Sequence, residues 1–274
     1  MRITRPNARG LQRVSGLLTC AGFSLLELSA VVFIVTILVS LLCAALNHTK
    51  SKALRITCLD NMKELQAAWW LYTVDNAEAI PLNQRAPAPA DPRIVQRRTS
   101  TNSWVAGNPV QDITTEYLTR GTLYEYLGSV STFRCPMDYS TVRRKADVLR
   151  TRSYAMSTYL GGDPEISPMP KYKWTELSRP DNVFVFIEEH ESSLWDSSFL
   201  VLPGVPRGRI SAASSAAWAS TPADRHAQGC NISFADGHIE YWRWYAPKEP
   251  TAPSHLASTG KDVRDITRLQ SCVP

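Results

Sequence analysis

The residue types best suited to bind a metal ion gather near one predicted β-hairpin. His226 precedes the hairpin, and Asp236 and His238 lie at its turn. Imidazole nitrogens and carboxylate oxygens are common ligands of zinc and other divalent metals. The segment from Glu188 to His190 ends another predicted strand and adds further ligand types. One hypothesis is therefore a metal- or ligand-binding domain built on His226, Asp236 and His238.

The hairpin itself is predicted by Asp236-Gly237 between two alternating runs. A type I′ turn needs positive φ at both central residues, which aspartate and glycine tolerate. With these residues at the tip, Phe234 would oppose Ile239 and Ile232 would oppose Tyr241. Because opposed side chains share a face, four apolar residues would then lie on one side.

A simpler interpretation explains the same residues without a ligand. Asp236 is explained by the turn alone, and His226 can hydrogen-bond across the base of the hairpin. No serine, cysteine or carboxylate pair has a spacing that demands catalysis, so we expect no enzyme. Calcium is a further candidate, but no acidic loop identifies a site for it. We therefore expect no cofactor.

A different kind of chemistry is indicated at the N-terminus. Four arginines and no acid precede Gly22-Phe23, a lone carboxylate follows at Glu27, and Leu28 to Leu46 then contains 19 uncharged residues. As a helix this run would be about 28 Å long, enough to cross the hydrocarbon of a bilayer. The sequence predicts one transmembrane helix at residues 28–46, with the arginines on the cytoplasmic side.

Two other N-terminal signals fit less well. A secretory signal usually has an apolar region of about 7 to 15 residues followed by small residues, whereas this run is longer and no such site follows it. A lipoprotein signal would use Cys20, but only a few apolar residues precede that cysteine.

The pattern Gly22-Phe23-x-x-x-Glu27 resembles the processing signal of the type IV pilin and type II secretion pseudopilin superfamily. The resemblance implies that a prepilin peptidase cuts after Gly22 and methylates the new amine of Phe23. It also implies that Glu27 pairs with the N-terminal amine of a neighbouring subunit, which would make a buried carboxylate tolerable. The alternative is that Glu27 only reaches out to the membrane interface.

Three further stretches resemble the same superfamily. They are the segment around Cys58, the element Phe133-Arg134-Cys135-Pro136-Met137-Asp138, and His226 followed after nine residues by Asp236-Gly237. The last matches the H-X9-DG element of prepilin-type proteins of the Planctomycetes and Verrucomicrobia type. The implied partners are prepilin peptidase, other pilin or pseudopilin subunits and an inner-membrane assembly platform.

The cysteines suit an extracytoplasmic domain. Cys20 lies in the leader and Cys43 in the apolar run, and the other four are Cys58, Cys135, Cys230 and Cys272. Four cysteines allow three pairings, and free buried thiols are the alternative. The resemblance favours a disulfide between Cys58 and Cys135, because relatives often carry cysteine at both positions.

The charge distribution argues against nucleic acid as a partner. The formal charge of +5 misleads, because the leader supplies four of the 30 basic residues and 26 remain against 25 acidic ones. Nucleic-acid binding needs Lys and Arg clustered on one face. The basic runs at Arg97-Arg98 and Arg143-Arg144-Lys145 are short and typical of solvated loops.

The predicted fold is α+β and pilin-like. Apolar residues spaced by three or four continue past the membrane run, so one helix is expected over residues 23–74. It would pack on an antiparallel β-sheet domain over residues 75–247, with short helical turns between Trp104 and Leu127 and a hairpin at 230–244. Residues 1–22 would be the leader and 248–274 a C-terminal tail, partly ordered at best. The chain is expected in the inner membrane with its domain in the periplasm, as a subunit of a secretion or pilus-like fibre.

Overall fold

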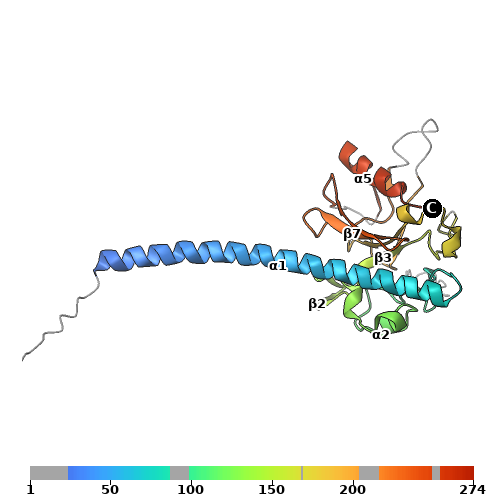
Figure 1. Ribbon diagram of the computed structural model, residues 1–274, viewed down its shortest axis with the longest axis horizontal. Coiled ribbons are helices and arrows are strands. Elements are labelled where there is room, and N and C mark those ends of the chain that lie inside the picture. The colour runs from blue at the N-terminus through green and yellow to red at the C-terminus, as the bar shows by residue number, and fades with distance from the viewer. Residues whose placement is uncertain (1–23, 87–98, 168, 204–215, 249–253) are drawn as a thin grey trace, which may run out of the picture. The chain divides into compact units, whose positions relative to one another are not determined.

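The computed structural model describes residues 24–86, 99–167, 169–203, 216–248 and 254–274. The predicted cleavage site between Gly22 and Phe23 lies outside these residues. The chain divides into two compact units, Met1–Lys50 and Ser51–Pro274. The helix α1, Leu25–Asp75, contributes to both (Figure 1).

The first unit contains the apolar part of α1. A helix was predicted over residues 23–74, and α1 is described over Leu25–Asp75. It contains neither glycine nor proline, the residues that most disfavour a helix interior. Within α1, Leu25–Cys43 is long and apolar enough to cross a membrane, a property that signal sequences share. Its described side chains are exposed, as expected of a helix whose apolar surface requires a non-aqueous environment or a partner.

The second unit contains the amphipathic part of α1. A stripe of residues spaced by three or four is fully buried there, namely Cys58, Met62, Leu65 and Trp69. This spacing places the four side chains on one face of the helix. The helix ends at Asp75, where Ala77 and Glu78 adopt positive φ and the Glu78 amide donates to the Thr73 carbonyl.

The central sheet of the second unit is mostly antiparallel. Its order is β5-β3-β4-β7-β8, in which only the β3–β5 pair is parallel. The strands of this sheet are β3 (Tyr154–Ser157), β4 (Phe184–Glu188), β5 (Ser198–Phe199), β7 (Gly229–Phe234) and β8 (Ile239–Arg243).

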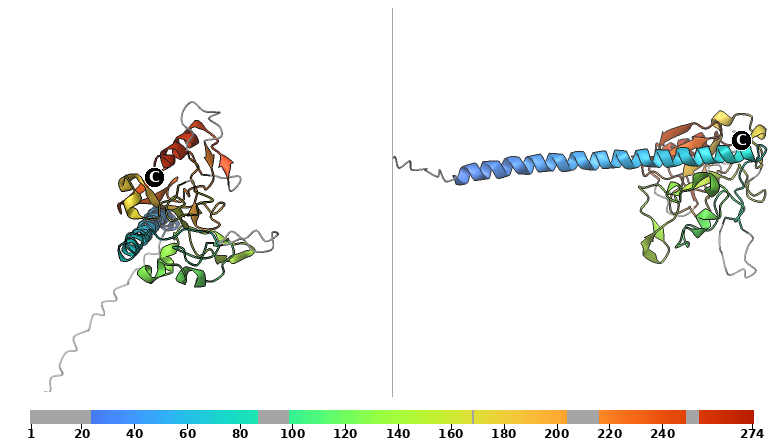
Figure 2. Two further views of the ribbon diagram at one scale, coloured as in Figure 1. Left: turned by 90° about the vertical axis from the view of Figure 1, so that its right-hand side faces the viewer. Right: turned by 60° about the horizontal axis from the view of Figure 1, so that its bottom comes forward.

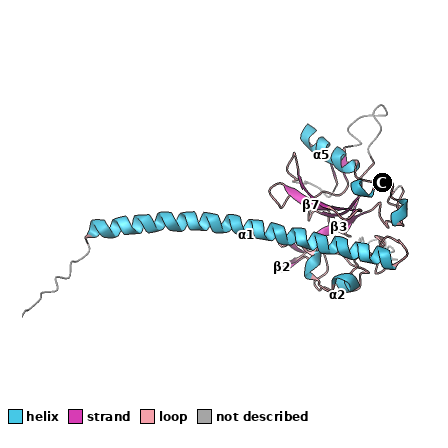
Figure 3. Ribbon diagram, viewed as in Figure 1, coloured by secondary structure: helices cyan, strands magenta, loops and turns pink. Residues whose placement is uncertain are grey.

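Smaller elements surround this sheet, as Figure 3 shows. Two two-stranded sheets pair β1 (Thr141–Val142) with β2 (Lys145–Leu149) and β6 (Ala217–Trp218) with β9 (His255–Leu256). The helices are α2 (Glu116–Thr119), α3 (Tyr124–Leu127) and α5 (Gly260–Gln270), with 3-10 turns η1 (Ser131–Phe133), η2 (Trp174–Glu176) and η3 (Pro180–Asn182). The helical turns expected between Trp104 and Leu127 are confirmed as α2 and α3.

The two faces of the sheet pack against different helices (Figure 2). One face joins the buried stripe of α1 in a core that includes Trp104, Phe133 and Phe186. The other face joins α5 through Ile266 and Leu269. We call these the α1 face and the α5 face. Burial of apolar side chains on both faces is the main force that holds the second unit together.

The predicted hairpin forms, but its predicted register is wrong. Ser233, not Phe234, opposes Ile239. The Phe234 amide donates to the His238 carbonyl, and only Gly237 of the turn has positive φ. This is the three-residue loop built from a type I turn and a left-handed glycine, rather than a two-residue type I′ turn.

The observed register differs from the predicted one by one residue, and such a shift moves side chains to the opposite face of the sheet. Phe234 and Ile232 belong to the core on the α5 face, whereas Ile239 packs with the core on the α1 face. The four side chains predicted to share one face are therefore divided between the two faces.

The described part of the C-terminal tail is folded, whereas the sequence predicted that the tail would be partly ordered at best. Gly260–Gln270 forms the amphipathic helix α5, whose N-cap Thr259 accepts a hydrogen bond from the Asp262 amide. Lys248 is buried, and its Nζ lies 2.7 Å from an oxygen of Asp262 and 2.9 Å from one of Asp265. These ion pairs and the apolar face of α5 make the described part of the tail an integral part of the second unit.

The architecture is therefore a mixed α+β fold with an N-terminal apolar helix and antiparallel-rich sheets, as the expected fold class requires.

Candidate functional site

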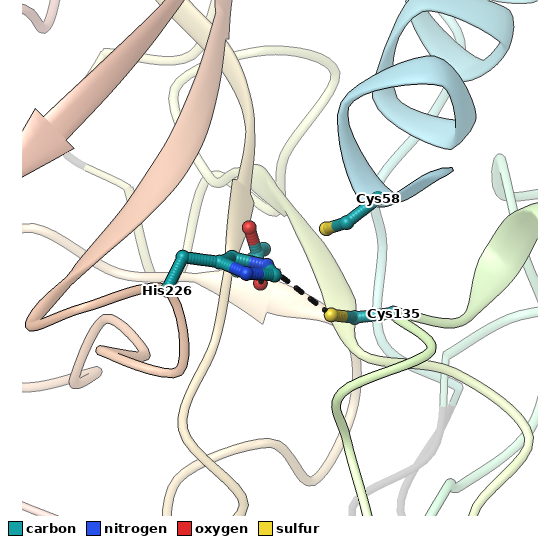
Figure 4. Close-up of side chains that lie close together, drawn as sticks. Cys58, Cys135 and His226 are labelled. Atoms are coloured by element: carbon teal, nitrogen blue, oxygen red, sulfur yellow. Dashed lines mark hydrogen bonds and ion pairs between the residues drawn. The ribbon is translucent and has the colours of Figure 1, made fainter. Parts of the chain in front are cut away.

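Four side chains that are far apart in the sequence meet on the α1 face of the sheet. They are Cys58, Cys135, Glu188 and His226, and one ligand atom from each lies within 4.8 Å of the other three. Figure 4 shows Cys58 reaching from α1, Cys135 from a loop and His226 from the opposite side. All four residues are buried. We call this group the buried ligand cluster.

The two cysteines are positioned by α1 and by the loop after η1. Cys58 belongs to the buried stripe of α1, and its Sγ lies 3.2 Å from the Tyr154 hydroxyl. Cys135 is held by its own amide, which donates to Ser153 Oγ at 3.1 Å. Asn61 of α1 donates to the Arg134 carbonyl at 2.8 Å and so fixes this loop against the helix.

Glu188 reaches the α1 face because β4 is irregular. The register between β4 and β7 shifts between Phe184 and Ile187, so that Phe184 packs on the α5 face while Phe186 packs on the α1 face. Glu188, two residues after Phe186, then points to the α1 face as well. Its Oε1 accepts hydrogen bonds from the amide and the Nδ2 of Asn231, at 3.0 and 3.3 Å.

His226 faces both an acid and a thiol with one ring nitrogen. Its Nε2 lies 3.1 Å from Glu188 Oε2 and 3.4 Å from Cys135 Sγ. The carboxylate contact has ion-pair distance but not hydrogen-bond geometry, so Oε2 is buried without a hydrogen-bond partner among the described residues. Within the same described part of the chain, Nδ1 of His226 is also buried without a hydrogen-bond partner.

The charges of the cluster favour a cation at its centre. Burial alone would lower the pKa of His226, but Cys135 and Glu188 outweigh it and raise that pKa to about 9. Burial also opposes ionisation of Glu188, yet the contact with His226 keeps its pKa below the usual value. The Cys58 interaction lowers the pKa of Cys135, whereas burial raises that of Cys58. A proton on His226 thus supplies the positive charge that these groups require.

Arg225 adds a second positive charge beside the cluster. Its guanidinium lies 3.4 Å from Asp138 and 3.0 Å from Glu191. Burial alone would lower the pKa of Arg225, but Asp138, Glu188 and Glu191 raise it. The charge of Arg225 is therefore matched by Asp138 and Glu191, next to the segment that carries His226.

The predicted ligand set is not brought together. His238 Nδ1 lies 2.6 Å from Asp236 Oδ1 at the partly exposed turn, whereas His226 is buried before the start of β7. Six residues of extended β7 separate the two places, about 20 Å.

The three ligand candidates at the end of β4 also have different surroundings. Glu188 joins His226, but the carboxylate of Glu189 is buried elsewhere, and burial raises its pKa to about 8. His190 contacts Ser192 at 3.0 Å.

The two cysteines thought to form a disulfide are neighbours with free thiols. Glu188 and His226 were both among the predicted metal-ligand types, whereas Cys58 and Cys135 were predicted to form a disulfide. No local spacing joins them, since each belongs to a different segment. One feature of the sequence could have pointed to the cluster. Several metal-ligand residues lie in or beside the motifs that resemble the pilin superfamily.

Glu27 has a local partner at the start of α1. The Ser24 amide donates to Glu27 Oε2 at 2.9 Å, and the Glu27 amide donates to Ser24 Oγ at 3.2 Å. Ser24 and Glu27 thus form a capping box, which satisfies two amides that the first turn leaves unpaired. The carboxylate has a structural role that neither of its two earlier interpretations included.

Comparison of the chain with family models, with curated proteins and with solved structures found no match.

Proposed function

We propose that this chain is a pilin-like structural subunit anchored in the cytoplasmic membrane, with its second unit on the extracytoplasmic side. The observation that carries the proposal is α1, a single helix of 51 residues. Its first part exposes apolar side chains over Leu25–Cys43, and its later part is buried in a folded domain. A subunit that assembles through membrane helices needs this continuity between anchor and domain.

Processing would precede assembly. Prepilin peptidase would cut after Gly22, which makes Ser24 the second and Glu27 the fifth residue of the mature chain. The capping box uses only residues that remain after this cut, so the mature helix keeps its start. Glu27 would then serve two purposes, since it caps its own helix and pairs with the amine of a neighbouring subunit.

Mass spectrometry of the mature chain from its native host tests the processing step. The expected N-terminus is N-methylated Phe23. An intact Met1, or an N-terminus beyond about residue 40 as a secretory cut would leave, would overturn the proposal.

Three variants separate the two purposes of Glu27. Glutamine can replace glutamate in a capping box but has no charge, so Glu27→Gln should be processed and yet fail to enter fibres. Ser24→Ala weakens the cap while keeping the carboxylate, and should still assemble. Glu27→Ala removes both functions and should behave like Glu27→Gln. Normal assembly of Glu27→Gln would remove the charge-pairing role.

The genes beside this one would distinguish a type II secretion pseudopilin from a pilus subunit. Neighbouring secretion genes would favour the first, neighbouring pilus genes the second, and an isolated gene a specialised role outside both. The rival interpretation, an anchored domain that binds metal through His226, Asp236 and His238, loses support because the last two residues lie at the far end of the hairpin from His226.

A further inference from the structure

We propose that Cys58, Cys135, Glu188 and His226 form a binding site for one zinc ion. The proposal does not depend on assembly into a fibre, because all four residues belong to the second unit. The ion would take Sγ of both cysteines, Oε2 of Glu188 and Nε2 of His226. No metal is required by any step of the proposed assembly, so the site is a property of its own.

The ligand types and their number suit zinc. Structural zinc sites are almost always four-coordinate and tetrahedral, with cysteine, histidine and carboxylate ligands at about 2.0 to 2.3 Å. Such bonds place neighbouring ligand atoms about 3.3 to 3.8 Å apart. In the cluster, Nε2 of His226 lies 3.4 Å from Cys135 Sγ and 3.1 Å from Glu188 Oε2. All four atoms fall within 4.8 Å of one another, so small side-chain movements complete a tetrahedron.

One unpartnered atom of the cluster points to a ligand. Glu188 is fully buried, and among the described residues its Oε2 has no hydrogen-bond partner, although Oε1 has two. The close contact that Oε2 does make is with Nε2 of His226, at 3.1 Å. A buried carboxylate oxygen that accepts no hydrogen bond is costly, and a metal ion held between Oε2 and Nε2 of His226 would satisfy it. Asn231, which holds Oε1, also places its Nδ2 3.6 Å from Cys58 Sγ. Asn231 therefore orients two ligands as an outer-shell residue commonly does.

The surrounding charges fit an occupied site. Two thiolates and one carboxylate around a divalent ion leave only one negative charge in excess, and Arg225, the residue before His226, places a buried guanidinium in the same part of the chain, where it pairs with Asp138 and Glu191. The four ligands come from α1, the loop after η1, the end of β4 and the segment before β7. A bound ion would therefore fasten α1 to the sheet, which is a structural rather than a catalytic role.

Metal analysis of the full-length chain, purified in detergent without chelator, tests the site. We expect close to one zinc per chain, and its loss in Cys58→Ser, Cys135→Ser and His226→Gln. Two matched controls should keep the metal: Cys272→Ala, a buried cysteine two residues after α5, and His238→Gln, the partly exposed histidine of the turn. Zinc that survives the three ligand variants, or that is lost equally in the controls, would overturn the proposal.

A spectroscopic test avoids the question of whether variants fold. The wild-type chain, reduced, stripped of metal and titrated with Co²⁺, should develop the visible absorption of a tetrahedral ion and the near-ultraviolet bands of thiolate ligation at one equivalent. Zinc should then displace the cobalt. Absence of thiolate bands would overturn the proposal. A Cys58–Cys135 disulfide found in the native chain, with no metal uptake after its reduction, would also overturn it and establish the disulfide instead.

Discussion

The two ends of the β7–β8 hairpin present the same pair of chemical groups in opposite surroundings. His226 lies 3.1 Å from Glu188 with both side chains fully buried, whereas His238 lies 2.6 Å from Asp236 with 39% and 36% of their side chains exposed. Water already solvates the second pair, so its contact contributes only about 0 to 1 kcal/mol. The first pair is shielded from solvent and depends on its protein neighbours. Distance alone would have ranked the two pairs in the wrong order.

The two pairs also differ in the groups that lie beside them, because only the buried pair has two thiols nearby. Cys58 and Cys135 stand beside the buried pair, while at the turn the Phe234 ring stacks on His238 with centroids 4.4 Å apart. A histidine and a carboxylate become a candidate metal centre only where further ligands converge and solvent is excluded. The H-X9-DG element therefore contains one residue of a buried cluster and one turn, and the two parts have separate physical roles.

Removing each histidine in turn is the strongest test of the difference between the two ends. His226→Ala leaves Glu188 as a buried carboxylate without its cation, and we expect it to lower the free energy of unfolding by about 3 to 5 kcal/mol. His238→Ala removes a partly exposed partner and should cost at most about 1 kcal/mol.

Denaturant unfolding followed by tryptophan fluorescence measures this difference. All eight tryptophans lie in the second unit, so the signal reports on that unit alone. A chelator in every sample removes any metal contribution and leaves the ion pair as the quantity compared. Equal losses in the two variants would show that the buried pair is no more important than the exposed one.

A smaller effect is expected from neutralising each acid. Glu188→Gln keeps an oxygen to accept the two Asn231 hydrogen bonds but removes the charge that faces His226, so we expect a loss of about 1 to 3 kcal/mol. Asp236→Asn at the turn should change the same free energy by less than about 0.5 kcal/mol. The same unfolding measurement applies, and a larger effect at Asp236 would contradict the contrast between the two ends.

Local patterns predicted the elements of this fold better than their pairing. The long apolar and then amphipathic periodicity identified α1 within two residues at its start, because helical spacing is a property of neighbouring residues. The strands β4 and β7 were also predicted. The hairpin register was not, because Asp236-Gly237 fits both a two-residue and a three-residue loop and the choice depends on packing against two cores.

The helix α5 could have been predicted. Thr259 is followed three residues later by Asp262, and Val263, Ile266 and Leu269 follow at helical spacing. This is a start signal with an apolar stripe, which the proximity to the C-terminus obscured. The buried ligand cluster could not have been predicted in the same way. Its four residues depend on the irregular register of β4 and on the docking of α1, which are tertiary features.

The smallest expected loss of stability concerns the turn at the tip of the hairpin. In the three-residue loop only Gly237 has positive φ, at 100°, and a Cβ there would lie 3.3 Å from Trp70 Nε1. Gly237→Ala should therefore destabilise by about 1 to 2 kcal/mol. Asp236→Ala should cost less, through loss of its contacts with His238 alone. A type I′ turn would instead require positive φ at Asp236 as well, so equal losses in the two variants, measured by the same unfolding curves, would restore the two-residue turn.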